Sequence, residues 1–307
     1  MTTTRNPVEA ASEALAASSL GSSLRRDVPI GPLTTYRVGG SASLFLTVED
    51  RTELLELSAI TSLVGVDVLV VGRGSNMLVA DSGFHGLAVV LGPAFARVEI
   101  RGTRVIAGGA ALLPVVARSC AEAGLGGFEW AVGVPGSIGG AVRMNAGGHG
   151  ADMAASLVSV EVVDLARGGV TTSEPGELAL GYRTSSLEST DVVVSAELEL
   201  RAGDSERSRA EMAEIVRWRR ANQPGGQNAG SVFTNPRGDS AGRLIDTAGA
   251  RGMRVGTAEV STKHANFIQA DEGGTAADIV ALMSEVKRRV LPGEAVVKFT
   301  PGKEPPL

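Results

Sequence analysis

Hydrophobic residues along this chain fall into two kinds of pattern. Short runs rich in β-branched residues, which are typical of strands, occupy residues 66–71, 88–91, 105–107, 158–164 and 192–200. Longer stretches with helical spacing or helical start and stop signals occupy residues 49–61, 113–123, 205–222 and 275–290. Residues 196–200 alternate between apolar and polar side chains, which predicts a strand with one buried face. This mixture predicts an α+β fold, or an α/β fold with irregular loops.

The best candidate for a domain boundary is the highly charged helix at residues 205–222, which Gln223-Pro224-Gly225-Gly226-Gln227 follows. We expect a second domain over residues 201–307. Residues 1–23 are rich in Ala, Ser and Thr, and we expect a loose N-terminal extension there, although residues 9–20 could form a helix. This segment lacks the pattern of a signal peptide, and no run of about 18 apolar residues predicts a transmembrane helix. We therefore expect a cytoplasmic protein that does not bind membranes.

The composition narrows the class of protein. The chain has 40 glycines among 307 residues, with 43% hydrophobic and 21% charged residues. The absence of a three-residue period excludes collagen, and the hydrophobic content argues against wholesale disorder. A net charge of −5 and 4% aromatic residues argue against a nucleic-acid partner. Abundant glycine in a chain that can bury a core predicts tight turns and close backbone approaches, which phosphates and cofactors require.

Metal and disulfide chemistry are not expected. Cys120 is the single cysteine, so an intramolecular disulfide is excluded, and its helical surroundings favour a small buried thiol. With three histidines and one cysteine in the chain, we expect no metal site.

Two glycine-rich loops are candidates for ligand binding. A strand runs into Gly72-Arg73-Gly74-Ser75-Asn76, where glycines allow backbone N–H groups to form an anion-binding nest. Met77 stands where a dinucleotide fingerprint needs its third glycine, and no helical signal follows, so we reject a Rossmann motif. The second loop, residues 133–150, contains seven glycines and lacks the Gly-Lys-Ser/Thr of a P-loop.

Several polar residues are ambiguous when each is taken alone. Arg183 beside Tyr182 suits the capture of a carboxylate or phosphate, whereas Ser231 would be an ordinary loop serine. A structural role is favoured for His264. The cluster Arg217-Trp218-Arg219-Arg220 is either a solvated helix face or the wall of a site for an anionic substrate.

An ordered series of motifs changes this picture. It comprises Thr35-Tyr36-Arg37-Val38-Gly39-Gly40, Gly72-Arg73-Gly74-Ser75-Asn76 with Gly83-Phe84-x-Gly86, Gly133-Val134-Pro135-Gly136-Ser137-Ile138-Gly139-Gly140, Met144-Asn145-Ala146-Gly147, Tyr182-Arg183-x-Ser185, Ala229-Gly230-Ser231-Val232-Phe233-x-Asn235-Pro236, Leu244-Ile245-Asp246-x-Ala248-Gly249 and His264-Ala265-Asn266-Phe267-Ile268. In this series the chain resembles the UDP-N-acetylenolpyruvoylglucosamine reductases, also called UDP-N-acetylmuramate dehydrogenases, over residues 33–290.

The resemblance implies a fold and a reaction. It implies an α+β fold with an FAD-binding domain of the vanillyl-alcohol-oxidase (PCMH) type over residues 24–200, in subdomains of about 24–92 and 93–200, and a C-terminal α+β substrate-binding domain over 201–307. It also implies an oxidoreductase of peptidoglycan precursor synthesis, with FAD as cofactor and NADPH as co-substrate. The partners would be a UDP-sugar and NADPH, and we expect a monomer.

The resemblance also implies roles for individual residues. Arg183 matches the catalytic arginine and Ser231 the proton donor, while Glu294 is the nearest match to a C-terminal catalytic glutamate, with Glu304 as a rival. The implied flavin contacts are Gly72, Arg73, Gly74, Ser75, Asn76, Leu78, Gly133, Pro135, Gly136, Ser137, Gly139, Gly140, Ala141 and Asn145. The implied substrate contacts are Tyr182, Arg219, Asn235 and His264.

Other functions stay open at this point. The residues before Ala229 and before the histidine motif depart from the usual family pattern, which leaves room for a paralogue that reduces a related sugar nucleotide. An FAD-dependent oxidase of the same fold and a non-catalytic flavin- or sugar-nucleotide-binding protein are the further alternatives. A tyrosine-bearing insertion after Tyr182-Arg183 is not evident, which favours the subgroup that lacks this loop.

Overall fold

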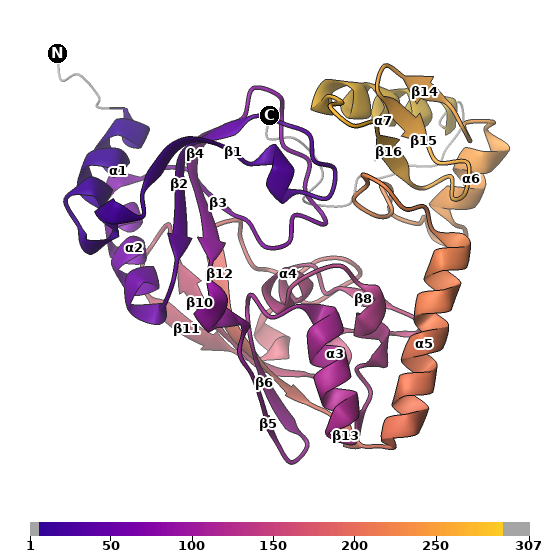
Figure 1. Ribbon diagram of the computed structural model, residues 1–307, viewed down its shortest axis with the longest axis horizontal. Coiled ribbons are helices and arrows are strands. Elements are labelled where there is room, and N and C mark those ends of the chain that lie inside the picture. The colour runs from indigo at the N-terminus through magenta and orange to yellow at the C-terminus, as the bar shows by residue number, and fades with distance from the viewer. Residues whose placement is uncertain (1–5, 291–307) are drawn as a thin grey trace. The chain divides into compact units, whose positions relative to one another are not determined.

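The computed structural model describes residues 6–290, and its chain divides into two compact units (Figure 1). Unit 1 consists of residues 6–28, 42–73 and 85–217, and unit 2 consists of residues 29–41, 74–84 and 218–290. The division falls after Arg217 and not at the predicted residue 201. Unit 2 also takes in two segments from the N-terminal third of the chain, which no local pattern indicates.

The first sheet of unit 1 has the strand order β1-β2-β4-β3. Its strands are β1 (Arg25–Pro29), β2 (Ser41–Val48), β3 (Val68–Val70) and β4 (Phe84–Leu91). Helix α2 (Arg51–Val64) begins at Asp50, whose carboxylate accepts hydrogen bonds from the N–H groups of Thr52 and Glu53. It ends at Gly65, where φ is 65°.

The N-terminal segment is packed and not loose. Helix α1 (Pro7–Ala16) begins at the N-cap Asn6 and carries Pro7 at its first position. Ala11, Leu15 and Leu20 are fully buried in one core with residues of α2 and the first sheet. The expected loose extension is therefore wrong for residues 6–23, because the few apolar side chains of this Ala-rich segment share one face.

The second sheet of unit 1 is antiparallel, with the strand order β11-β10-β12-β6-β5. Its strands are β5 (Val98–Arg101), β6 (Arg104–Gly108), β10 (Leu157–Asp164), β11 (Val170–Ser173) and β12 (Asp191–Glu199). The alternation predicted at residues 196–200 is confirmed, since Ala196, Leu198 and Leu200 are buried between more exposed glutamates. Helices α3 (Leu113–Glu122) and α4 (Ile138–Arg143) contribute to the same core.

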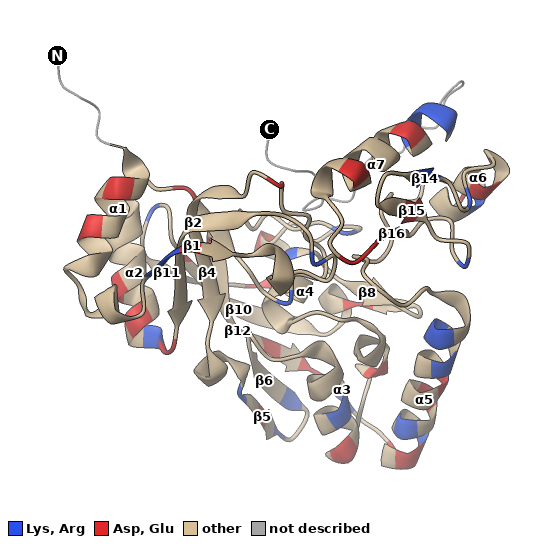
Figure 2. Ribbon diagram, turned by 45° about the horizontal axis from the view of Figure 1, so that its top comes forward, with Lys and Arg blue, Asp and Glu red and all other residues tan. Residues whose placement is uncertain are grey.

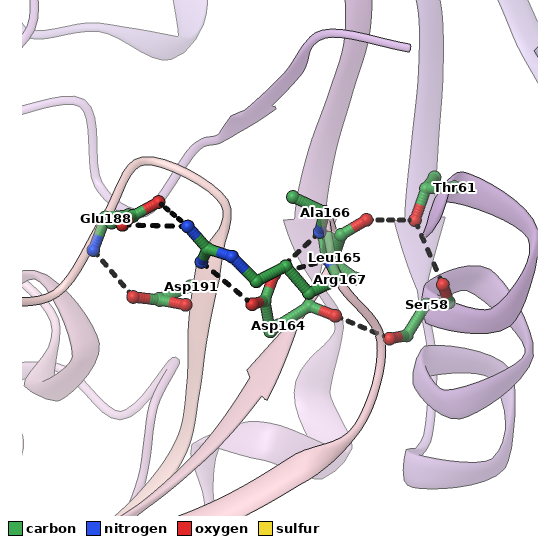
Figure 3. A network of polar contacts seen from close by, with 8 residues as sticks. All are labelled: Ser58, Thr61, Asp164, Leu165, Ala166, Arg167, Glu188 and Asp191. Atoms are coloured by element: carbon green, nitrogen blue, oxygen red, sulfur yellow. Dashed lines mark hydrogen bonds and ion pairs between the residues drawn. The ribbon is translucent and has the colours of Figure 1, made fainter. Parts of the chain in front are cut away.

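Polar contacts join the two halves of unit 1 (Figure 3). Ser58 and Thr61 of α2 donate hydrogen bonds of 2.6 Å to the carbonyls of Asp164 and Leu165, at the end of β10. Arg167 pairs with the carboxylate of Asp164 in the turn that follows. These bonds fix the first sheet's helix against the second sheet's hairpin.

Helix α5 (Ser205–Asn222) is the charged helix that the sequence predicts, and Figure 2 shows acidic and basic residues along it. Its N-terminal part is held by Glu129, a buried carboxylate that accepts a 2.6 Å hydrogen bond from Ser208. The short elements of unit 1 are η1 (Ser19–Ser22), η3 (Pro93–Ala96), β7 (Leu125–Gly126), η4 (Glu129–Gly133), β8 (Gly147–Gly148), β9 (Ala151–Asp152), η5 (Met153–Ala155), η6 (Pro175–Glu177) and β13 (Arg201–Ala202).

Unit 2 is built on a three-stranded antiparallel sheet of order β14-β15-β16. Its elements are η2 (Gly31–Leu33), α6 (Ala241–Thr247), β14 (Arg254–Val255), β15 (Ala258–Val260), β16 (Ile268–Ala270) and α7 (Ala276–Val290). The apolar stripe predicted on the last helix is confirmed, because Ile279, Leu282, Met283 and Val286 are all buried. Asp81 accepts bonds of 2.8 and 2.9 Å from the N–H groups of Ala276 and Ala277 and so caps α7.

Within residues 6–290, no helix has both the length and the apolar character needed to cross a membrane. The same part of the chain holds no group of three His, Cys, Asp or Glu side chains placed to bind a metal ion.

Candidate active site

The first glycine loop follows β3 without a helix after it, as the sequence predicts. Gly72 and Arg73 are exposed and belong to unit 1, whereas the residues from Gly74 onward belong to unit 2. Gly74 has a φ of 58°, and a methyl group there would lie 2.3 Å from the carbonyl oxygen of Leu33. Only glycine fits this position. Ser75 and Asn76 are half-buried, and Leu78 is part of the core of unit 2.

The second glycine loop contains a short helix that sequence patterns did not reveal. Ser137 is the N-cap of α4, and Gly139 donates a 2.8 Å hydrogen bond to the carbonyl of Gly109. A methyl group on Gly139 would lie 3.1 Å from that same carbonyl oxygen, so this face of α4 is tightly packed. Gly140 and Pro135 are exposed, while Gly133, Ser137 and Ala141 are buried.

The two loops lie next to each other in unit 1. A methyl group on Gly72 would be 3.0 Å from the hydroxyl oxygen of Ser137. A methyl group on Gly140 would lie 3.7 Å from the same oxygen, so the exposed residues Gly72 and Gly140 both lie beside the side chain of Ser137.

Arg183 stands on a tight turn of unit 1. The backbones of Gly181 and Thr184 exchange hydrogen bonds of 3.0 and 3.3 Å, which closes the turn around Tyr182 and Arg183. Arg183 has a φ of 60°, a left-handed conformation that is unfavourable for a residue with a side chain. Ser185, just after the turn, donates a 2.7 Å hydrogen bond to the carbonyl of Arg143.

The guanidinium of Arg183 is held by carbonyl oxygens and an aromatic ring. One terminal nitrogen lies 2.6 Å from the carbonyl oxygen of Gly147, and the other lies 3.4 Å from that of Asn145. The guanidinium carbon lies 5.3 Å from the ring centre of Tyr182, a residue that is 64% exposed. The side chain thus lies beside the end of the second glycine loop.

Ser231 is exposed in unit 2, and the segment that carries it is fixed by backbone contacts with residues 266 and 267. It forms an isolated antiparallel bridge with Phe267, and Val232 donates a 2.8 Å hydrogen bond to the carbonyl of Asn266. The buried side chain of Asn266 forms two further bonds with the backbone of Phe233. Asn266 belongs to the histidine motif, but its clamping role was not anticipated from the sequence.

The predicted substrate contacts of unit 2 have local roles that the structure defines. His264 packs edge-on against Phe267, and its Nδ1 accepts a hydrogen bond from the N–H of Asn266. Burial lowers the pKa of His264. Asn235 is exposed and accepts a bond from the N–H of Ala241 at the start of α6. Arg219 is half-buried, and this burial lowers its pKa. Glu294 and Glu304 lie outside the described residues.

The α+β architecture, with glycine backbone exposed in two loops, suits a protein that binds a flat or phosphorylated cofactor, and the comparisons identify this class as FAD-binding. A family model described as "FAD binding domain" matches residues 42–174, and one described as "UDP-N-acetylenolpyruvoylglucosamine reductase, C-terminal domain" matches residues 222–295. A UDP-N-acetylenolpyruvoylglucosamine reductase from Paramagnetospirillum magneticum is 44% identical over 266 residues, or 86% of each chain. One from Symbiobacterium thermophilum is 41% identical over 87% of each chain. The chain belongs to the UDP-N-acetylenolpyruvoylglucosamine reductase family.

A solved structure agrees with this assignment. The crystal structure of the reductase from Thermus caldophilus matches with a TM-score of 0.80 at 36% identity, covering 90% of this chain and 98% of that one. The resemblance inferred from the motifs is therefore confirmed, together with the α+β fold and its FAD-binding domain of the vanillyl-alcohol-oxidase type.

Proposed function

We propose that this protein uses FAD and NADPH to reduce the enolpyruvyl ether of UDP-N-acetylenolpyruvoylglucosamine to UDP-N-acetylmuramate, a peptidoglycan precursor. The named reductases that support this activity align with 86% or more of the chain. The structural observation that carries it is the guanidinium of Arg183. Its partners are carbonyl oxygens and a ring, and within residues 6–290 no carboxylate pairs with it. Its charge is therefore available to an anionic group of the substrate.

The residues of unit 1 fit an FAD cofactor. Gly72 and Gly140 expose backbone at adjacent points, so a flat ring or a diphosphate can approach without meeting side chains. Arg73, the next residue after Gly72, is exposed and carries a positive charge. The individual flavin contacts that the sequence suggests remain predictions.

Bound FAD would supply the hydride chemistry, with NADPH as the reductant and the enolpyruvyl double bond as the acceptor. Hydride addition leaves an electron pair on the carbon next to the carboxylate, so negative charge develops there. We assign Arg183 to hold this carboxylate and stabilise that charge, as a bidentate guanidinium can. We assign Ser231 to donate the proton that completes the lactyl ether. Glu294 is proposed from the resemblance alone to assist this proton transfer.

The proposal is tested by identifying the product. With NADPH and UDP-N-acetylenolpyruvoylglucosamine, mass spectrometry should show a product heavier by one hydride and one proton. Oxygen consumption without NADPH would support an oxidase instead. Turnover of a related sugar nucleotide, with none of this substrate, would support a paralogue. The monomeric state, the cytoplasmic location and the substrate contacts at Tyr182, Arg219, Asn235 and His264 remain predictions.

A further inference from the structure

Asn145 is buried, with 4% of its surface exposed, and all of its polar groups bond within unit 1. Its side-chain Nδ2 donates to the carbonyl of Gly181 at 3.0 Å and to the carboxylate of Asp152 at 3.1 Å. Its Oδ1 accepts from the N–H of Ala154 at 2.9 Å. Its own N–H donates to Val142, and its carbonyl accepts from Arg183.

These bonds converge on the turn that carries Arg183. The carbonyl of Gly181 accepts from both Thr184 and Asn145, so the side chain of Asn145 fixes the first residue of the turn. The backbone carbonyl of Asn145 then receives the guanidinium of Arg183 from the same turn. One residue thus holds both the backbone and the side-chain charge of Arg183.

The backbone of the turn needs such support. Arg183 has a φ of 60°, and residues in this region persist where their surroundings over-determine the conformation. Asn145 itself has a φ of 36°, at the position after the C-cap of α4 where asparagine and glycine are favoured. The end of α4 is therefore coupled rigidly to the turn.

We propose that Asn145 is a positioning residue, which acts through Arg183 by fixing the turn 181–184 and the direction of its guanidinium. This inference rests on the proposed function, in which Arg183 holds the substrate carboxylate. It differs from the flavin contact that the resemblance implies for Asn145, because each polar group of Asn145 already has a protein partner. Asn145 would affect the rate through the position of the Arg183 guanidinium, because a displacement of about 1 Å can lower a rate about 10²-fold.

The test uses Asn145→Gly, which removes the side chain while glycine still tolerates the positive φ. In anaerobic stopped-flow experiments with the holoenzyme, reduction of the flavin by NADPH should stay within about twofold of wild type. Reoxidation by UDP-N-acetylenolpyruvoylglucosamine should slow by about 10²-fold. Flavin content, read from the visible absorbance of the purified protein, should be unchanged. Loss of flavin would overturn the inference in favour of a cofactor contact.

A double-mutant cycle with Arg183→Lys separates positioning from a general loss of structure. If Asn145 acts through Arg183, then Asn145→Gly should slow reoxidation by less than about threefold in the Arg183→Lys background. Equal effects of Asn145→Gly in both backgrounds would overturn the inference. Thr61→Val is the matched control: it removes buried hydrogen bonds of unit 1 on α2, lowers the unfolding midpoint and should leave both half-reactions unchanged.

Wild type is measured in the same experiment. If its reduced flavin is not reoxidised by this substrate, the proposed function fails and the inference fails with it. If wild type is active and the two substitutions have additive effects, the inference alone fails.

Discussion

The side-chain amide of Asn266 pairs with the backbone of Phe233 through two reciprocal hydrogen bonds. The N–H of Phe233 donates to Oδ1 of Asn266 at 2.9 Å, and Nδ2 of Asn266 donates to the carbonyl of Phe233 at 2.8 Å. Both residues are buried, with 3% and 2% of their surfaces exposed. The pair therefore fixes the segment that presents Ser231, much as Asn145 fixes the turn that presents Arg183.

Replacing Asn266 by Ala should destabilise the protein. The substitution removes two buried hydrogen bonds to the backbone of Phe233, and the loss of each is expected to cost about 1–3 kcal/mol. We expect the free energy of unfolding, measured by urea denaturation, to fall by about 2–4 kcal/mol. Asn222→Ala is the control, because it removes one exposed hydrogen bond, from Nδ2 of Asn222 to the carbonyl of Trp218, and should cost about 1 kcal/mol or less. Equal losses for the two variants would contradict the clamp.

Ser231→Ala should separate the two halves of the reaction. Removing a general acid typically costs about 10²–10⁴-fold in rate, so formation of the lactyl ether should slow by that order. Reduction of the flavin by NADPH requires no proton from Ser231 and should be unchanged. Stopped-flow absorbance measures each step. Product formation at the wild-type rate would remove Ser231 from the role of proton donor.

Gly140→Ala should weaken FAD binding without harming the fold. A methyl group there meets only the hydroxyl of Ser137 at 3.7 Å, and alanine within a helix is about 0.5–1 kcal/mol more stable than glycine. We expect flavin-free protein to unfold at a slightly higher urea concentration. The dissociation constant for FAD, measured by flavin fluorescence, should rise by about tenfold, or about 1.4 kcal/mol.

The control for Gly140 is Gly148→Ala. A methyl group on Gly148 meets no atom within 4 Å, and this residue lies outside the predicted flavin contacts. Its affinity for FAD should match wild type. Unchanged affinity in Gly140→Ala would show that the backbone of this helical turn does not face the flavin.

Stability in acid should depend on Glu129. Burial raises the pKa of this carboxyl, but hydrogen bonds from Ser208 and Gly127 outweigh it, so the folded-state pKa lies below the usual value. A carboxyl group with a lowered pKa stabilises the folded state when it is ionised. This stabilisation is complete above the unfolded-state pKa of about 4.3 and is lost as the pH falls through the folded-state pKa. In urea denaturation between about pH 5 and pH 3, wild type should therefore lose more stability than Glu129→Gln. Parallel pH profiles for the two proteins would contradict this.

The elements with regular patterns could be predicted from the sequence. The buried stripe of α7 and the alternation at the end of β12 follow from side-chain periodicity, and both are present. Helix α4 was missed because two glycines in its first turn weaken the helical signal, although Ser137 is a typical N-cap. Local patterns contain no information on the docking of residues 74–84 into unit 2, which depends on long-range bonds such as those of Asp81.

The sequence predicted only part of the candidate site, because local patterns reveal short motifs but not long-range contacts. Glycine loops and the Arg183 and Ser231 motifs could be found from the order of short motifs. The hydrogen bonds by which Asn145 and Asn266 hold these segments could not be predicted. Each of these side chains bonds to a backbone carbonyl that is distant in the sequence. Buried amides of this kind have no periodic signature.

The absorbance of the flavin under anaerobic conditions tests the central claim most directly. We expect the purified protein to be yellow, and NADPH to bleach its visible absorbance. Addition of UDP-N-acetylenolpyruvoylglucosamine should then restore the oxidised spectrum in proportion to the substrate added. A flavin that NADPH bleaches but this substrate leaves reduced would contradict the account.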